Sequence, residues 1–194
     1  LQNEFGGALR RNVPMRDYTS FHIGGAADAV LFAQSEEQLV RAVRLCREAG
    51  ERYLVVGNGS NLLVSDRGVR DLVIMIRDAF SQVSFSDETM ALGAGVRLTA
   101  AAQAAAGQSL SGLEFAYGIP GNIGGAVYMN AGAYGGEMKD VVISVTACDF
   151  EGNIREFTAS ELDFAYRHSI FTGGGYVILS AKLRLTAGDK TAIA

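Results

Sequence analysis

Two glycine-rich segments constrain the fold of this chain more than any other feature of its sequence. They are Gly57-Asn58-Gly59-Ser60-Asn61, directly after the apolar residues 53–56, and Gly118-Ile119-Pro120-Gly121-Asn122-Ile123-Gly124-Gly125-Ala126. Glycine lets backbone N–H groups approach an anion with no side chain between them. The chain has 24 glycines and 2 prolines, and the glycines alternate with apolar residues instead of the Ser, Pro or Gln of a disordered linker. The pattern therefore indicates ordered loops whose backbone lies close to a neighbour.

Neither segment fits the two most familiar phosphate-binding motifs. A P-loop requires Gly-Lys followed by Ser or Thr, and no lysine is near residues 57–61. A dinucleotide fingerprint has a third glycine that opens a helix, whereas Leu62 occupies that position. An ordinary tight turn at 57–61 and a buried helix–sheet connection at 118–126 stay open as alternatives. Two lysine-free loops in one chain nevertheless favour a ligand with a pyrophosphate and a large flat ring, and FAD fits that description better than a nucleoside triphosphate.

The hydrophobic pattern predicts an α+β fold. Residues 27–33 and 53–56 read as strands, and between them a helix begins at Ser35, with Gln38 completing a capping box, and ends at Gly50. A third strand is expected to begin at residues 62–64, which makes residues 27–64 a strand–helix–strand unit. Further strands are predicted at residues 72–76, 82–85, 89–94, 141–149, 154–157 and 176–185, with an alanine-rich helix at 97–106. We expect a small lobe at residues 1–68 and a larger mixed lobe at 69–188.

Charge and composition argue against several classes of partner. The net charge is -4, which disfavours nucleic acid because phosphate binding needs a basic face. No uninterrupted apolar stretch approaches the roughly 20 residues that span a bilayer, and the first residues lack the apolar core of a signal peptide. The isolated Cys46, Cys148, His22 and His168 predict reduced structural thiols and no metal site. We therefore expect a cytoplasmic protein without membrane insertion, whose oligomeric state the sequence leaves open.

An ordered set of motifs resembles the UDP-N-acetylenolpyruvoylglucosamine reductase family over nearly the whole chain. The motifs are YTSFHIGG at 18–25, GNGSNLL at 57–63, SGLEF at 111–115, GIPG at 118–121, GAVYMNAGAYGG at 125–136 and YRHS at 166–169. The resemblance implies an FAD-binding fold of the vanillyl-alcohol-oxidase (PCMH) type, with non-covalent FAD between two subdomains. It implies that the FAD pyrophosphate lies on residues 57–61 and Leu62. It further implies that the GIPG loop, with Gly124, Gly125 and Ala126, lines the pyrophosphate and the flavin.

The resemblance also implies a reaction. In that family NADPH reduces FAD, and the reduced flavin passes hydride to the enolpyruvyl double bond of a UDP-sugar, which gives UDP-N-acetylmuramate for peptidoglycan synthesis. Arg167 matches the arginine of the family's Tyr-Arg-x-Ser motif, and its guanidinium can bind the substrate carboxylate bidentately as negative charge develops there. Tyr166 and Tyr134 are the other candidate substrate contacts, and Tyr134 equally fits a half-buried aromatic that covers its loop.

The family's proton-donor serine and partner glutamate lie in a C-terminal substrate domain, to which no residue of this chain corresponds. Residues 189–194 are expected to begin that domain, so the chain is expected to be the FAD-binding portion of a longer protein, weakly active or inactive alone. Two other functions stay open: the FAD subunit of a molybdenum-type hydroxylase, and a non-catalytic flavin-binding module. The YTSFHIGG and YRHS motifs disfavour the first, and a reading frame that continues beyond Ala194 would disfavour the second.

Overall fold

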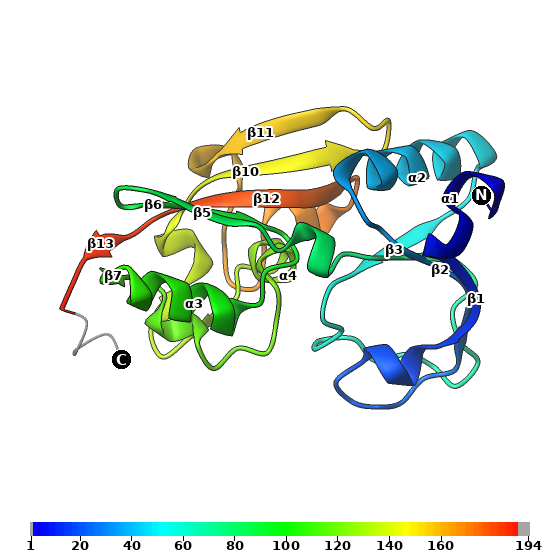
Figure 1. Cartoon of the computed structure of the whole chain (residues 1–194), viewed down its shortest axis with the longest axis horizontal. Helices are drawn as coiled ribbons and strands as arrows, with labels where there is room; N and C mark the ends of the chain where they lie inside the picture. The colour runs from blue at the N-terminus through cyan, green and yellow to red at the C-terminus, as the bar shows by residue number, and fades with distance from the viewer. Residues whose placement is uncertain (1, 190–194) are drawn as a thin grey trace.

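Two β-sheets organise the chain into two lobes in the computed structural model, which describes residues 2–189 (Figure 1). The first sheet has the order β1-β2-β4-β3, in which β1 is antiparallel to β2 and the other pairs are parallel. The second has the antiparallel order β11-β10-β12-β6-β5. The first sheet consists of β1 (Leu9–Pro14), β2 (Ala26–Phe32), β3 (Tyr53–Val56) and β4 (Leu72–Met75), and the second of β5 (Val83–Ser86), β6 (Thr89–Gly93), β10 (Val142–Asp149), β11 (Ile154–Thr158) and β12 (Tyr176–Arg184).

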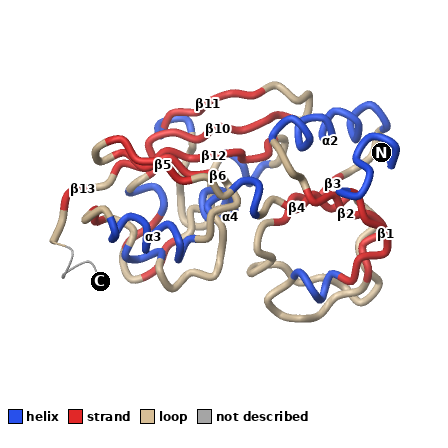
Figure 2. Tube along the Cα trace, viewed as in Figure 1, coloured by secondary structure: helices blue, strands red, loops and turns tan. Residues whose placement is uncertain are grey.

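The remaining elements are short apart from two helices (Figure 2). The helices are α1 (Gln2–Phe5), α2 (Glu36–Ala49), α3 (Leu98–Gly107) and α4 (Ile123–Tyr128), and α3 and α4 lie below the second sheet in Figure 1. Two strand pairs complete the fold: β7 (Leu110–Ser111) with β13 (Thr186–Ala187), and β8 (Gly132–Ala133) with β9 (Gly136–Glu137). The 3-10 turns are η1 (Gly6–Ala8), η2 (Met15–Tyr18), η3 (Asp78–Phe80), η4 (Glu114–Ala116), η5 (Met138–Asp140), η6 (Ala159–Glu161) and η7 (Ile170–Gly173).

Helix α2 joins the two lobes through a shared core. Its first turn is capped as predicted, because the Ser35 side chain accepts a hydrogen bond from the Gln38 N–H at 3.2 Å. The Gln38 side chain reaches one residue further back than a capping box requires and accepts from the Gln34 N–H at 2.8 Å. Gly50 ends the helix in the left-handed conformation, at φ 67. The buried face of α2 belongs to the same hydrophobic cluster as the buried residues of the second sheet, so one continuous core runs through both lobes.

The predicted α+β character and most predicted elements are confirmed within a few residues. One predicted strand is absent, and strand β1 is present although it was not predicted. No strand begins at residues 62–64, because this segment runs as a loop against residues 24–25, where the Gly25 N–H donates to the Ser65 carbonyl at 2.9 Å. Strand β1 was not predicted, because buried and exposed residues do not alternate along it.

The expected boundary between residues 68 and 69 falls too early. Strand β4 lies beyond it and yet pairs in parallel with both β2 and β3 inside the first sheet. All four β4 residues are buried, so this strand is central to the first lobe. The chain passes to the second lobe only after Ile76. Residues 190–194, which make up most of the expected start of a substrate domain, lie outside the described residues.

The described residues show no helix that is long and apolar enough to cross a membrane. Across residues 2–189, no three His, Cys, Asp or Glu side chains gather in a way that could hold a metal ion. Cys46 and Cys148 are both free and buried in the shared core. Burial raises the pKa of the Cys148 thiol to about 11, so this thiol is protonated at neutral pH and is a poor nucleophile.

Candidate functional site

The two glycine-rich segments come from different lobes and meet each other. We call residues 57–62 the first glycine loop and residues 118–126 the second glycine loop. The Asn58 side-chain amide donates to the Pro120 carbonyl at 3.1 Å, although the two residues are 62 positions apart in the sequence. The Ser60 Oγ lies 3.8 Å from the position a Cβ would take on Gly121. The junction of the lobes is therefore formed by the predicted loops themselves.

Residues 18–25 pack against the first glycine loop and support it. Gly59 is buried at φ 63, and a Cβ on it would lie 2.1 Å from the Tyr18 carbonyl oxygen. The Ser20 N–H donates to the Gly59 carbonyl at 3.1 Å. The YTSFHIGG motif thus acts as a support for the loop, and only glycine fits where the two segments touch.

The second glycine loop is fastened to the segment between β6 and α3. The Leu98 N–H donates to the Gly121 carbonyl at 2.9 Å, and the Ile123 N–H donates to the Val96 carbonyl at 2.8 Å. The Gly124 N–H donates to the Ala94 carbonyl at 2.9 Å, and a Cβ on Gly124 would lie 3.0 Å from the Ala94 side chain. Helix α4 starts directly from this anchored loop, so its position follows from the second sheet.

At three positions of the second glycine loop, Gly118, Gly121 and Gly125, neither backbone conformation nor neighbouring atoms require glycine. None has a positive φ. A Cβ on Gly118 or Gly125 would meet nothing within 4 Å, and one on Gly121 would meet its nearest atom at 3.6 Å. Their conformations and surroundings would accept alanine, in contrast to Gly59. Open space above bare backbone is the arrangement that lets a ligand approach closely, so this cradle fits the diphosphate and ring of FAD.

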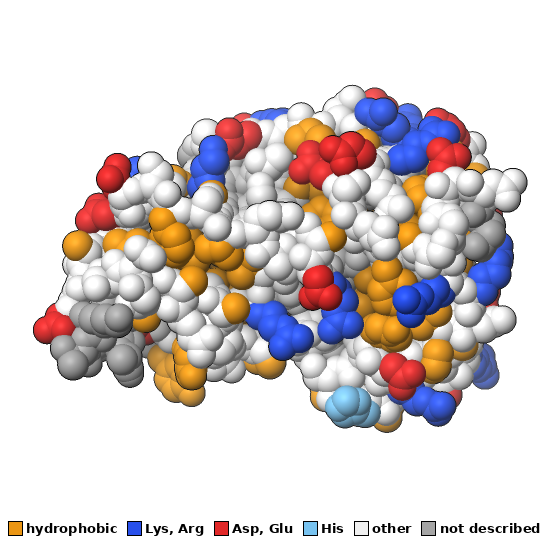
Figure 3. Space-filling model, in the orientation of Figure 1, with side chains coloured by type: hydrophobic (Ala, Val, Ile, Leu, Met, Phe, Trp, Pro, Cys, Tyr) orange, Lys and Arg blue, Asp and Glu red, His pale blue; other side chains and the backbone are white. Residues whose placement is uncertain are grey.

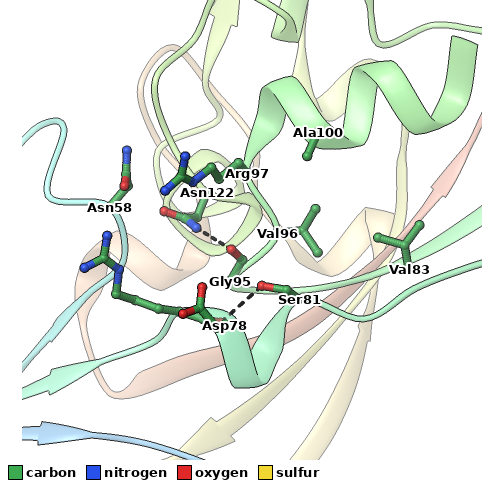
Figure 4. A pocket seen from close by; sticks show the side chains of 10 residues that line it. Asn58, Asp78, Ser81, Val83, Gly95, Val96, Arg97, Ala100 and Asn122 are labelled. Carbon is green, nitrogen blue, oxygen red and sulfur yellow. Dashed lines mark hydrogen bonds between the residues drawn. The ribbon is translucent and has the colours of Figure 1, made fainter.

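A cavity of about 230 Å³ lies where the glycine loops meet. Its lining is Asn58, Arg77, Asp78, Ser81, Val83, Gly95, Val96, Arg97, Ala100 and Asn122, most of which Figure 4 labels. Basic side chains gather where the lobes meet on the face in Figure 3, beside an acidic group. Asn122 is 6% exposed, and its Nδ2 donates to the Gly95 carbonyl. Its Oδ1 is buried and receives no hydrogen bond from any of residues 2–189.

Of the ten residues that line the cavity, only Asn58 was a predicted site residue, and Arg77, Arg97 and Asn122 are among those that the sequence did not indicate. Asn122 lies inside the second glycine loop, but the sequence suggests only a turn residue there, because the motif is defined by its glycines. Arg77 follows β4, and Arg97 precedes α3. Each is an isolated charge in the sequence, and only the folding of the two lobes brings them to one cavity.

The predicted substrate residues lie on two turns that touch each other. Backbone hydrogen bonds of 3.1 Å in both directions between Ala165 and His168 close a tight turn, which holds Arg167 at φ 53. The Arg167 guanidinium lies 5.6 Å from the Tyr166 ring centroid, and its Nη2 donates to the Gly132 carbonyl at 3.3 Å. Tyr134 occupies the two-residue connection between β8 and β9 at φ 52. Tyr134 and Tyr166 are 94% and 87% exposed, so both rings are available to a ligand.

Asn130 and Ser169 connect these turns to α4. Asn130 is buried, and its Nδ2 donates to Glu137 at 2.8 Å and to the Ala165 carbonyl at 3.0 Å. The fully buried Ser169 donates from Oγ to the Tyr128 carbonyl at 2.6 Å. Helix α4 therefore carries the second glycine loop at one end and the Arg167 turn at the other. Ser169 and Glu137 both serve this framework through their hydrogen bonds to Tyr128 and Asn130.

The comparisons with known proteins agree with this geometry. A family described as "FAD binding domain" matches residues 27–158. The UDP-N-acetylenolpyruvoylglucosamine reductase of Clostridioides difficile (strain 630) is 46% identical over 181 residues, which are 93% of this chain and 60% of that protein. The reductase of Alkaliphilus oremlandii is 47% identical over 176 residues, 91% of this chain and 58% of that protein. The chain thus spans about 60% of the length of these curated relatives.

Solved structures give the same result for the fold. The structure of UDP-N-acetylenolpyruvylglucosamine reductase from Thermus caldophilus superposes with a TM-score of 0.80 at 36% identity, and covers 95% of this chain and 64% of that one. An alkyldihydroxyacetonephosphate synthase superposes with a TM-score of 0.63 at 20% identity, over 84% of this chain and 34% of that one. The second likeness concerns the fold alone. The predicted fold type and the resemblance to the reductases are confirmed.

Proposed function

This chain belongs to the FAD-binding domain family, and on that premise we propose that its two glycine loops hold the diphosphate of FAD between the lobes. The observation that carries the proposal is the open cradle: Gly118, Gly121 and Gly125 leave bare backbone beside a loop from the other lobe. Residues 1–76 and 77–188 are then the two FAD-binding subdomains. The proposal includes non-covalent binding of the flavin, which is supported by the lack of a Cys or His tether within residues 57–62 and 118–126.

The second part of the proposal is that the chain is the FAD-binding portion of a UDP-N-acetylenolpyruvoylglucosamine reductase. The names of the curated relatives support it, and they favour the reductase over a molybdenum-type hydroxylase subunit. The substrates are then NADPH and an enolpyruvyl UDP-sugar, converted to UDP-N-acetylmuramate for the cell wall. The place of action is the cytoplasm, and the product supports cell shape and division.

Bound FAD supplies the transfer of hydride from NADPH to the enolpyruvyl carbon. The task of this chain is to orient the substrate and to stabilise charge. Addition of hydride to the enolpyruvyl double bond leaves negative charge that spreads into the substrate carboxylate. The Arg167 guanidinium binds that carboxylate. It stabilises the transition state more than the bound substrate, because more negative charge lies on the carboxylate there. Tyr134 and Tyr166 flank the carboxylate with their exposed rings.

Flavin retention tests the first part of the proposal. We expect the purified chain, mixed with FAD and passed through a gel-filtration column, to keep flavin absorbance with the protein peak. Riboflavin, which has the ring but no phosphate, is the matched control and should separate from the protein. A chain with a cooperative thermal transition that retains no FAD would contradict the proposal.

The substrate role of Arg167 is tested by ligand titration of the FAD-loaded chain. We expect Arg167→Gln to weaken binding of the enolpyruvyl UDP-sugar by about tenfold or more, since a hydrogen bond to a charged group contributes roughly 1.5–3 kcal/mol. The measurement is the change in flavin absorbance as the sugar is added. The fold should persist, because the structure shows the side chain making only a 3.3 Å bond to the Gly132 carbonyl and a contact with the exposed Tyr166 ring within residues 2–189. Equal affinities of variant and parent would show that Arg167 does not contact the substrate.

A further inference from the structure

We propose that the cavity at the junction of the glycine loops binds a phosphate together with its adjoining sugar hydroxyl, through Arg77, Arg97 and Asn122. This inference rests on the proposed binding of FAD and deepens it. It assigns side-chain charge to a site whose loops contain no lysine, and it names the part of the nucleotide that enters the cavity. The class of ligand is a sugar phosphate, which FAD contains twice, as an adenosine ribose phosphate and as a ribityl phosphate.

The two arginines are available to an anion. Within residues 2–189, neither Arg77 nor Arg97 forms an ion pair or a side-chain hydrogen bond, whereas Arg70 pairs with Asp28 and Arg155 pairs with Glu161. Arg77 lies 5.9 Å from the Tyr18 ring centroid, a weak contact that leaves its N–H groups free. Asp78 is the one acidic residue of the lining, so the cavity carries two positive charges and one negative charge. A dianionic or monoanionic phosphate complements that surplus, and a guanidinium matches two of its oxygens.

Asn122 adds a requirement that a phosphate alone does not meet. A carbonyl oxygen only accepts hydrogen bonds, so the contact with Gly95 fixes Nδ2 on that side and turns Oδ1 away from it. The buried Oδ1 lies 3.1 Å from the position a Cβ would take on Gly57, at the junction of the glycine loops. It needs a donor, and a phosphate oxygen supplies none under neutral conditions. A hydroxyl group beside the phosphate is a donor of the kind that Oδ1 lacks.

The size of the cavity sets how much of the ligand enters. Its volume of about 230 Å³ is below the roughly 300–1,000 Å³ typical of whole-ligand pockets. One sugar phosphate unit fits this scale, while the flat ring lies outside on the open glycines. The cavity and the cradle then bind neighbouring parts of one molecule.

The test measures the affinity of several ligands for Arg97→Gln and Arg77→Gln variants by fluorescence or calorimetric titration. We expect FAD to bind each variant about tenfold more weakly than the parent, and the loss to shrink in high salt. Arg97→Lys should recover only part of the loss, because it keeps the charge but not the paired contact with two phosphate oxygens. Arg11→Gln removes the same charge from β1, outside the cavity, and should leave the affinity for FAD unchanged. Thermal unfolding of each variant accompanies the titrations.

Two further ligands identify the source of the sugar phosphate. If ADP binds the parent and is weakened by Arg97→Gln, the cavity takes the adenosine side. If FMN shows this behaviour instead, the cavity takes the ribityl side, and either result supports the inference. Parent-like affinity for FAD in both arginine variants overturns it while the proposed function stands. A folded parent chain that binds no FAD overturns the proposed function and this inference together.

Discussion

Replacement of Gly59 by alanine is expected to destabilise the first lobe by about 3 kcal/mol and to abolish flavin retention. The residue has φ 63, where a side chain is strained, and a Cβ would lie 2.1 Å from the Tyr18 carbonyl oxygen and 3.1 Å from the Thr19 Cα. Both contacts are with backbone, so no side-chain rotation relieves them. The first glycine loop must move away from residues 18–20, and its contact with Pro120 is then lost. Urea unfolding and gel filtration with FAD measure the two effects.

Gly50 provides a matched control for this substitution. It has nearly the same φ, 67, but a Cβ on it would meet nothing within 4 Å. Gly50→Ala should therefore cost only the backbone strain, about 1 kcal/mol, and leave FAD retention intact. If Gly59→Ala proves as mild as Gly50→Ala, the close support of the loop by residues 18–20 is wrong.

Replacement of Gly125 by leucine is expected to give the opposite combination: a folded chain that binds FAD about a hundredfold more weakly. Gly125 lies in α4, is exposed, and faces no atom within 4 Å, so the helix accepts the side chain. Leucine also forms helices better than glycine by roughly 1 kcal/mol, which should raise the melting temperature of the free chain. The leucine side chain would fill the space above the cradle. The resulting overlap with FAD should weaken the free energy of binding by about 3 kcal/mol. Calorimetric titration with FAD and thermal unfolding without it check both signs.

Gly107 is the control for a leucine at an open helical glycine. It is the last residue of α3, is exposed, and likewise has nothing within 4 Å of a Cβ position. Gly107→Leu should change neither fold nor affinity for FAD. A Gly125→Leu variant with parent-like affinity would show that the ligand does not lie over α4.

Local signals made part of this fold predictable. Ser35 and Gly50 mark both ends of α2 through their own side chain and backbone, so neighbouring residues suffice to place that helix. The glycine loops were also found, because their composition is unusual over a few residues. Contacts between segments that are distant in the sequence could not be predicted in this way. The pairing of β4 with β2, the bond from Asn58 to Pro120, and the approach of Arg77 and Arg97 to one cavity all depend on topology.

The expected strand at residues 62–64 failed for the same kind of reason. Leu62, Leu63 and Val64 have strand-forming character, but the backbone of the following residue bonds to Gly25 instead of to a sheet. A short apolar run does not say which partner its backbone will find. The substrate candidates Arg167, Tyr134 and Tyr166 were proposed from the resemblance, whereas Asn122, whose Oδ1 has no donor within residues 2–189, emerged only from the folded arrangement.

The continuous core through α2 determines how the protein responds to destabilising substitutions. Helix α2 connects two strands of the first lobe, and its buried face belongs to the same hydrophobic cluster as the second sheet, so we expect the two lobes to unfold in one cooperative transition. Loss of a methyl group at the buried Val43 of α2 should therefore lower the melting temperature of the whole chain. We therefore expect the two lobes to keep their relative position until the whole chain unfolds, which favours a preformed cofactor site over one that closes around its ligand.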